Sequence, residues 1–199
     1  MSKKIAIQGE LGAYSHIAAE NLYAGAEIKT CTTFEETFKQ AYNDQNYKIV
    51  IPIENSLAGR VADIHYLLPK YKLQIHGEYF QTVEHNLLCK QDATIDDIKY
   101  VRSHAQAIGQ CQNIINKRKF KSIVSADTAG SAKELAEGKD KSIAAIASEL
   151  SAKIYNLKIL EKNIEDEKGN VTRFLIMGKK IEQPEFKSNK NYITSCIFR

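Results

Sequence analysis

The stretch L-Q-I-H-G-E-Y-F-Q-T-V-E-H-N-L-L-C, Leu73 to Cys89, lies near the middle of the chain and contains no helical pattern. It is typical of extended strand, and we expect a break near Gly77. Because no helix interrupts it, this stretch is expected to carry the chain from one α/β lobe into a second. The fold prediction depends on this crossing.

On both sides of the crossing, short apolar runs alternate with helical patterns. Strands are predicted at Lys4–Gln8, Ile28–Thr30, Lys48–Pro52, Tyr100–Arg102, Ser122–Ser125, Ser142–Ala145, Lys158–Leu160 and Arg173–Met177. Helices are predicted at Ile17–Tyr23, Phe34–Tyr42, Val61–Leu68, Ala105–Lys117, Thr128–Glu137 and Ala147–Tyr155. This alternation predicts an α/β fold with largely parallel sheets.

A second crossing is expected at Asn163–Asn170, which is acidic and turn-forming. It would return the chain so that the last predicted strand completes the first lobe, with a cleft between the lobes. Lobe 1 is then expected at about residues 1–78 plus 168–180, and lobe 2 at about 79–167. Residues 181–199 are expected to form a polar linker around Pro184 and the start of a fresh strand at Tyr192–Phe198.

The composition of the 199 residues, with 26% charged and 43% hydrophobic residues and a net charge of +4, is ordinary for a soluble globular protein. The cluster K-R-K-F-K, Lys117 to Lys121, is either a nucleic-acid patch or a helix end followed by a strand; without a second basic cluster we expect no nucleic-acid partner. The four cysteines form no C-x-x-C pair, so neither a disulfide framework nor a metal site is expected. No secretory signal and no run approaching ~20 apolar residues is seen, which predicts a cytoplasmic protein without a membrane partner.

Four turns after strands are rich in small polar residues: G-E-L-G-A-Y-S with Ser15, P-I-E-N-S-L-A-G, S-H-A-Q, and A-D-T-A-G-S with Thr128. Helix starts at the ends of parallel strands bind anions, because their N–H groups are unpaired. For any turn taken alone, helix capping is the favoured explanation. Together they favour an anionic small molecule in the crevice, whereas the glycine spacing fits neither a dinucleotide nor a P-loop motif.

Single residues in these turns have open roles. Glu54 is either an acid/base or a structural residue, and Asn55 is the better candidate for binding a ligand. Gln110 lies about two helical turns after Ser103 and is either a ligand-binding residue or a polar border of the helix. His104 is either a general base or a helix cap.

Five segments, in this order, resemble the prephenate dehydratases across Lys4 to Met177: G-E-L-G-A-Y-S, P-I-E-N-S-L-A-G, S-H-A-Q-A-I-G-Q-C, A-D-T-A-G-S-A and N-V-T-R-F. The last, Asn170 to Phe174, is the most distinctive. One departure is Ala105, where the family usually has proline. Alanine there is expected to lose some rigidity and no functional group.

The resemblance implies two α/β lobes like a type II periplasmic binding protein, and conversion of prephenate to phenylpyruvate. It implies that Thr172 is catalytic, that Asn55, Ser103 and Gln110 line the site, and that no cofactor is used. Arg173 contacts the substrate or pairs with a carboxylate such as Glu54, since neighbouring strand residues face opposite sides. Phe174 is expected in the core.

Alternatives stay open. An arogenate dehydratase performs the same chemistry on the aminated substrate, and a solute-binding module shares the fold without catalysis. The strand at Tyr192–Phe198 resembles the start of an ACT domain, so phenylalanine is expected as an allosteric effector only where that domain is complete. The family resemblance also implies a homodimer.

Overall fold

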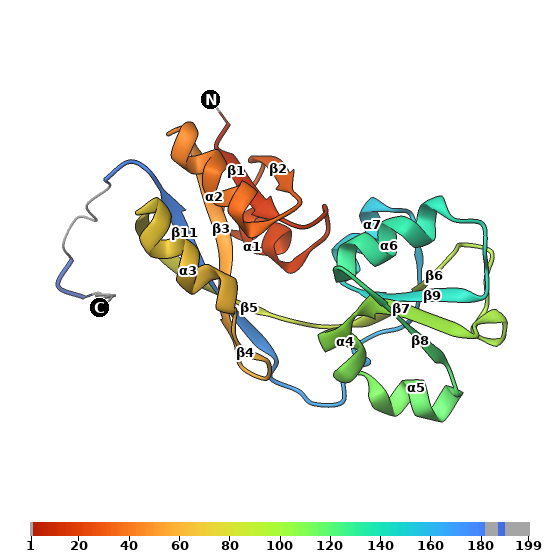
Figure 1. Cartoon of the computed structure of the whole chain (residues 1–199). Coiled ribbons are helices and arrows are strands. Elements are labelled where there is room, and N and C mark those ends of the chain that lie inside the picture. Colours follow the sequence, from red (N-terminus) through yellow and green to blue (C-terminus); the bar gives the residue numbers. More distant parts are fainter. Residues whose placement is uncertain (1, 182–186, 190–199) are drawn as a thin grey trace.

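A computed structural model describes residues 2–181 and 187–189; the predicted strand at Tyr192–Phe198 lies outside them. The chain forms two α/β lobes, each built on its own sheet, joined by two crossing segments (Figure 1). The first lobe holds the strands of residues 4–82 and 171–178, and the second those of residues 86–161. Among the described residues, no helix combines the length and apolarity needed to cross a membrane.

The sheet of the first lobe has the strand order β2-β1-β3-β11-β5, with a short β4 beside β3. Its strands are β1 (Lys4–Gln8), β2 (Glu27–Cys31), β3 (Tyr47–Asn55), β4 (Gly59–Arg60), β5 (Gln74–Thr82) and β11 (Val171–Gly178). Helix α1 (Tyr14–Leu22) covers one face, and α2 (Phe34–Asn43) and α3 (Ala62–Tyr71) cover the other.

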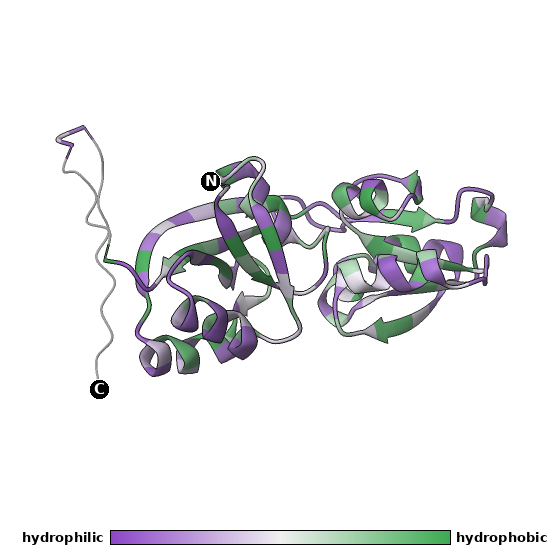
Figure 2. Cartoon of the chain, turned by 90° about the horizontal axis from the view of Figure 1, so that it is seen from above, coloured by the Kyte–Doolittle hydropathy of each residue, from purple (hydrophilic) through white to green (hydrophobic). Residues whose placement is uncertain are grey.

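Strand β3 shows why both faces of this sheet need covering. Val50 packs in the cluster on the α1 side, whereas its neighbours Ile49 and Ile51 pack in the cluster with α2 and α3. Successive strand residues point to opposite faces, so the continuous apolar run Ile49–Ile51 of β3 is buried on both sides. The helices match this arrangement, alternating hydrophobic and hydrophilic residues along their length (Figure 2).

The sheet of the second lobe has the order β10-β6-β9-β7-β8. Its strands are β6 (Asn86–Cys89), β7 (Tyr100–His104), β8 (Lys121–Ser125), β9 (Ile143–Ala147) and β10 (Lys158–Glu161). Helices α4 (Ala105–Gly109) and α5 (Gln112–Arg118) pack on one face, and α6 (Thr128–Glu137) and α7 (Glu149–Ile154) on the other. A 3-10 turn, Ile95–Asp97, precedes β7.

The sheets are mixed, which corrects the prediction of largely parallel sheets. Strand β1 is parallel to β2 and β3, and β7 is parallel to β8 and β9. Strand β11 is antiparallel to both of its neighbours, and so is β6. Both strands follow a crossing between the lobes, so no βαβ unit sets their direction.

The break expected near Gly77 is also wrong. Strand β5 continues through Gly77 to Thr82, pairing with β11 along its whole length, and a bulge beside Gly77 absorbs the local irregularity. The chain leaves the first sheet only at Val83–His85, later than the expected boundary at residue 78.

Two helices differ from prediction because of distant contacts. The helix expected at Ala105–Lys117 divides at Gln110, where Asp166 from the second crossing accepts from the backbone N of Gln112 and Asn113 at 2.8 and 3.0 Å. This carboxylate caps α5 from far along the chain. Helix α3 continues through Pro69 to Tyr71, whose ring packs 5.7 Å from that of Phe38. The last predicted helix begins later, because Ala147 ends β9.

Candidate active site

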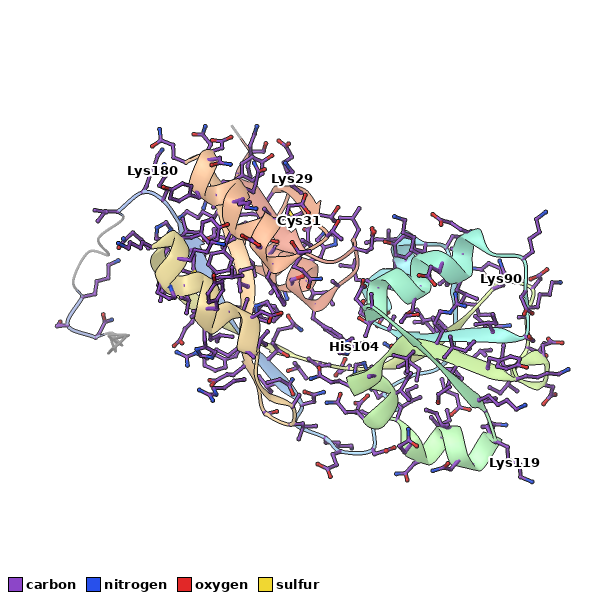
Figure 3. The ribbon with its side chains drawn as sticks, viewed as in Figure 1. Lys29, Cys31, Lys90, His104, Lys119 and Lys180 are labelled. Carbon is purple, nitrogen blue, oxygen red and sulfur yellow. The ribbon has the colours of Figure 1, made fainter. Side chains whose placement is uncertain are left out.

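A cavity of about 480 Å³ lies between the two lobes at the carboxyl ends of β1, β3 and β7. All four polar turns contribute to its wall, including Ser15, Asn55, His104 and Thr128. His104 is seen between the lobes in Figure 3. A crevice at the carboxyl ends of strands is where α/β sheets bind their ligands.

Thr172, the residue expected to be catalytic, lines this cavity from β11 and is 9% exposed. Its Oγ1 accepts a hydrogen bond from Asn55 Nδ2 at 2.9 Å. Within the described part of the chain the Thr172 hydroxyl donates to no other group, so its hydrogen is available to a bound molecule. Register explains the proximity, because Thr172 and Asn55 are directly paired across β11 and β3.

Asn55 lines the cavity, but its polar atoms are already engaged within the protein. Its Oδ1 accepts from the backbone N of Leu57 and Ala58 at 3.0 and 2.8 Å, which shapes the turn between β3 and β4. Its Nδ2 donates to Thr172 and, at 2.6 Å, to Asn170 Oδ1. The turn Pro52–Gly59 is therefore a hairpin rather than a helix start, and Asn55 orients Thr172.

Gln110 is connected to the same group through Asn170. Asn170 Nδ2 donates to Gln110 Oε1 at 2.9 Å, and His85 Nε2 lies 2.9 Å from that oxygen. The other ring nitrogen of His85 lies 3.0 Å from the Tyr14 hydroxyl, which donates to the carbonyl oxygen of Glu84 at 2.7 Å. We call these residues the amide chain: Thr172, Asn55, Asn170, Gln110, His85 and Tyr14. It reaches from the first lobe through both crossing segments into the second.

Arg173 lies on the opposite face of β11 from Thr172 and does not line the cavity. Its Nε donates to Glu78 at 2.7 Å and its guanidinium contacts Glu54 at 3.2 Å. Burial is the largest single influence on the pKa of Arg173 and lowers it, but the hydrogen bonds and ion pairs with Glu54 and Glu78 together outweigh burial and raise the pKa above its usual value. Of the two roles expected for Arg173, the structure has the pairing with Glu54 and not the position for a substrate contact. Neither Arg173 nor Glu54 lines the cavity.

Ser103 does not reach the cavity either. It is fully buried in β7, and its Oγ donates to the carbonyl oxygen of Ile146 in the neighbouring β9 at 2.7 Å. His104, the next residue, faces the other way and lines the cavity, with Nδ1 accepting from Gln106 N at 3.3 Å. The direct substrate contact predicted for Ser103 is therefore corrected to a bond within the second sheet.

Ser15 and Thr128 lie in the first turns of α1 and α6, and both line the cavity. The two helix starts differ. Asp127 caps α6 by accepting from Gly130 N, whereas the N-cap residue of α1, Ala13, makes no side-chain cap bond. The carboxylate of Asp127 partly neutralises the positive end of the α6 dipole. The start of α1 has no such carboxylate cap and therefore leaves more of its positive end available to an anion.

Four residues of the site escaped prediction: Arg60, Tyr14, His85 and Asn170. Arg60 is the one lysine or arginine among the residues that line the cavity. Asn170 opens the N-V-T-R-F segment, so its position was a usable signal. Arg60 and His85 carry no motif, and only the fold shows where they lie. Burial is the largest influence on His85 and lowers its pKa, while its bond to Gln110 and the charge of Glu165 act in the opposite direction.

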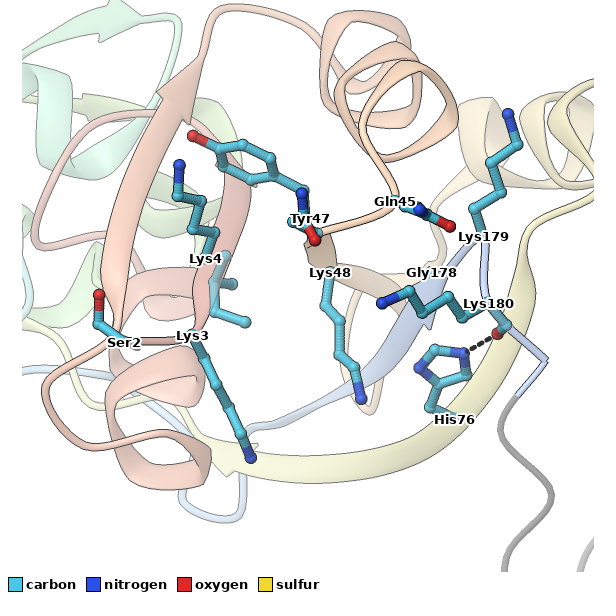
Figure 4. A pocket seen from close by; sticks show the side chains of 12 residues that line it. Ser2, Lys3, Lys4, Gln45, Tyr47, Lys48, His76, Gly178, Lys179 and Lys180 are labelled. Carbon is cyan, nitrogen blue, oxygen red and sulfur yellow. Dashed lines mark hydrogen bonds between the residues drawn. The ribbon is translucent and has the colours of Figure 1, made fainter.

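A second cavity, about 720 Å³, lies at the other end of the first sheet and is lined by lysines (Figure 4). It contains none of the residues of the amide chain and none of the four polar turns. Nor do the described residues contain a group of three or more metal-binding side chains. The cavity between the lobes is therefore the candidate active site.

The family model of prephenate dehydratase matches residues 5–182, nearly the whole chain. This chain belongs to the prephenate dehydratase family. It is 38% identical over 204 residues to the prephenate dehydratase of Methanocaldococcus jannaschii, covering all of this chain and 72% of that protein. It is 39% identical over 195 residues to the chloroplastic arogenate dehydratase/prephenate dehydratase 2 of Arabidopsis thaliana, covering 98% of this chain and 51% of that protein.

Among solved structures, a prephenate dehydratase of Arthrobacter aurescens in complex with L-Phe is similar, with a TM-score of 0.84 and 25% identity. The likeness covers 92% of this chain and 63% of that one. This chain therefore spans about half of the Arabidopsis relative and less than two thirds of that structure.

Proposed function

We propose that this chain carries a prephenate dehydratase active site, which converts prephenate to phenylpyruvate, carbon dioxide and water in phenylalanine biosynthesis. Residues 1–180 would form the catalytic unit, with residues 181–199 as the linker and the start of an ACT domain. The observation that carries the proposal is the Thr172 hydroxyl, which accepts from Asn55 at 2.9 Å and keeps its own hydrogen available at the cavity.

The reaction requires little more than orientation and help for a leaving hydroxide. Prephenate has two carboxylates and a ring hydroxyl, and loss of one carboxylate as carbon dioxide with that hydroxyl forms an aromatic ring. Thr172 donates a hydrogen bond to the departing hydroxyl, where negative charge develops. Asn55 donates to Thr172 Oγ1 and so polarises the hydroxyl group. This makes the Thr172 hydroxyl a stronger hydrogen-bond donor to the substrate.

The substrate's carboxylates need positive partners. Arg60, which lines the cavity from the position where β4 pairs it with Glu54, would turn its guanidinium toward a carboxylate, and the start of α1 at Tyr14 and Ser15 provides backbone N–H groups. Gln110 Nε2 donates no hydrogen bond within the described part of the chain, so it is available for a polar group of the substrate.

The test compares two substitutions at one position. Thr172→Ala removes the donor and is expected to lower kcat for prephenate by about 10²- to 10³-fold. Thr172→Ser keeps the hydroxyl and is expected to retain most of kcat. Formation of phenylpyruvate measures both variants, and circular dichroism with thermal melting checks that they are folded. A folded Thr172→Ala variant with full activity would remove the proposed role.

Arogenate is the second candidate substrate, because relatives about as similar carry arogenate dehydratase in their names. Two groups at the cavity oppose each other here: Arg60 disfavours the ammonium of arogenate, whereas Asp127 favours it. Competition between equal concentrations of prephenate and arogenate, with both products quantified, measures the ratio of kcat/KM directly. Turnover of neither would favour a solute-binding role.

A further inference from the structure

The hydrogen bonds of the amide chain have a direction that can be assigned from its fixed end. Backbone N–H groups only donate, so the Asn55 oxygen must face Leu57 N and Ala58 N, at 3.0 and 2.8 Å. The Asn55 amide nitrogen then faces inward. It donates to Thr172 Oγ1 at 2.9 Å and to Asn170 Oδ1 at 2.6 Å, and the carbonyl oxygen of Val171 is a longer third contact at 3.3 Å. The side chain of Asn55 therefore has a single consistent orientation.

The orientation of Asn55 in turn fixes the directions of the hydrogen bonds that lead to the second lobe. Asn170 Oδ1 accepts, so Asn170 Nδ2 is the atom that donates to Gln110 Oε1 at 2.9 Å. That oxygen can only accept, and His85 Nε2 lies 2.9 Å from it. The short contact is a hydrogen bond only when His85 Nε2 carries a hydrogen. The network thus selects one tautomer of a histidine that is 2% exposed.

We propose that His85 is a positioning residue, which donates from Nε2 to Gln110 Oε1 and thereby fixes the amides that orient the Thr172 hydroxyl. This role rests on the proposed function only for its effect on catalysis. The direction of the bonds follows from the backbone groups alone. His85 borders the cavity, but four hydrogen bonds separate its ring from the Thr172 hydroxyl, so its bond to Gln110 acts on Thr172 through the amides.

The far side of the ring accommodates a change of protonation without disturbing this bond. Tyr14 faces Nδ1 at 3.0 Å, and its hydroxyl also lies 2.7 Å from the Glu84 carbonyl oxygen. With a neutral ring, Tyr14 donates to Nδ1 or to that carbonyl; with a protonated ring, Nδ1 donates to Tyr14. In both states Nε2 keeps its hydrogen. The carboxylate of Glu165, which accepts from the His85 backbone N at 3.0 Å, is the nearby charge.

The chain offers a matched pair of substitutions. In His85→Gln the amide nitrogen can occupy the place of Nε2, which preserves the donor to Gln110. In His85→Asn the shorter amide can occupy only the place of Nδ1, next to Tyr14. We expect His85→Gln to retain most of kcat and His85→Asn to lose about 10- to 100-fold in kcat, with little change in KM for prephenate. A role limited to packing would lower the melting temperature of the smaller Asn variant without a specific loss of kcat.

The tautomer itself is measured on the unmodified chain by two-dimensional ¹H–¹⁵N correlation of the histidine ring nitrogens, at a pH where His85 is neutral. A hydrogen on Nε2 is expected, and a hydrogen on Nδ1 alone would overturn the proposal whatever the variants do. Equal kcat in folded Gln and Asn variants would also overturn it. If prephenate is not turned over at all while Nε2 carries the hydrogen, the assigned function fails and the bond direction stands.

Discussion

At the scale of single residues, the site depends on which side of a strand each side chain faces. Thr172 and Arg173 are neighbours in β11, yet Thr172 points into the cavity and Arg173 pairs with Glu54 and Glu78 on the other face. This pairing engages the guanidinium and so removes Arg173 as a partner for an anion in the cavity. Among the residues that line the cavity, Arg60 is the one lysine or arginine, and it also lines the neighbouring pocket of Glu54 and Arg173. A substitution there should separate binding from chemistry.

Arg60→Ala is expected to raise KM for prephenate by roughly 10- to 100-fold with a small effect on kcat, because a hydrogen bond between charged groups contributes about 1.5–3 kcal/mol. Arg60→Lys should restore part of the binding. Arg118→Ala is the control, since Arg118 pairs with Glu161 far from the cavity. Initial rates over a range of prephenate concentrations give both constants. An unchanged KM in Arg60→Ala would contradict this assignment.

The sequence motifs predicted where the site lies better than they predicted which side chains line it. The four polar turns and N-V-T-R-F all reach the cavity, because the carboxyl ends of strands gather there. Direct contact was wrongly expected for Ser103, whose hydroxyl binds the carbonyl of Ile146 on a strand distant in sequence. His85 and Arg60 gave no signal, since their roles arise only when two lobes meet. Local pattern carries no information about such distant partners.

At the scale of elements, local signals predicted the strands and most helices, whereas distant contacts decided the exceptions. The division between α4 and α5 follows from capping by Asp166, and the direction of β11 from a crossing between lobes. One further element, the loop before α1, was expected either to cap the helix or to bind an anion. It also packs against α7: the carbonyl oxygen of Gly12 accepts from Ser148 and Ser151 at 2.6 and 3.1 Å.

Gly12→Ala tests whether this packing matters for the site. Gly12 has a φ of +91°, and a Cβ there would lie 2.8 Å from the Cα of Ser151. Gly25→Ala is a matched control, because Gly25 has a φ of +73° with no atom within 4 Å of the added Cβ. Both substitutions should cost about 1–2 kcal/mol for backbone conformation. Only Gly12→Ala should lower the melting temperature further and reduce kcat/KM; equal effects would show that the contact is unimportant.

At the scale of the whole molecule, the lobes meet through the Gly9–Ser15 loop and through the amide chain. Each contact includes a buried histidine: His16 Nδ1 accepts from Gly12 N at 3.0 Å, and His85 joins Gln110 to Tyr14. Burial is the largest influence on both residues and lowers the pKa of each below 6.5. For His16, protonation of Nδ1 would also remove the acceptor for Gly12 N.

Acid should therefore weaken the fold in a defined range. A lowered pKa in the folded state means that the unfolded chain binds more protons as the pH falls. The stability contributed by the neutral forms of His16 and His85 is therefore fully present above pH 6.5 and is lost as the pH drops below it. His16→Asn keeps an acceptor for Gly12 N and cannot titrate. It should lose less stability than the unmodified chain between about pH 7 and about pH 5 in urea unfolding. An identical loss in both proteins would exclude His16 as a source.

Glu35 has a lowered pKa of its own, and its effect on stability falls in a lower pH range than that of the histidines. Hydrogen bonds from Lys70 and Tyr71 lower the pKa of Glu35 to about 2, so its contribution is lost only as the pH falls below about 4.5 toward that value. Losses above that range therefore report on the histidines.

The amide chain includes one side chain from each crossing segment, His85 and Asn170, and both bind the same oxygen of Gln110. The two segments are also the parts of the backbone about which the lobes would rotate. Rotation that moves Gln110 would change the donors to its oxygen and the orientation of the Thr172 hydroxyl together. Substrate affinity and the angle between the lobes would then be thermodynamically linked, and such a linkage is reciprocal. A second molecule that binds one angle more tightly than another would change the affinity of the cavity for substrate. Bound substrate would change the affinity for that second molecule by the same factor.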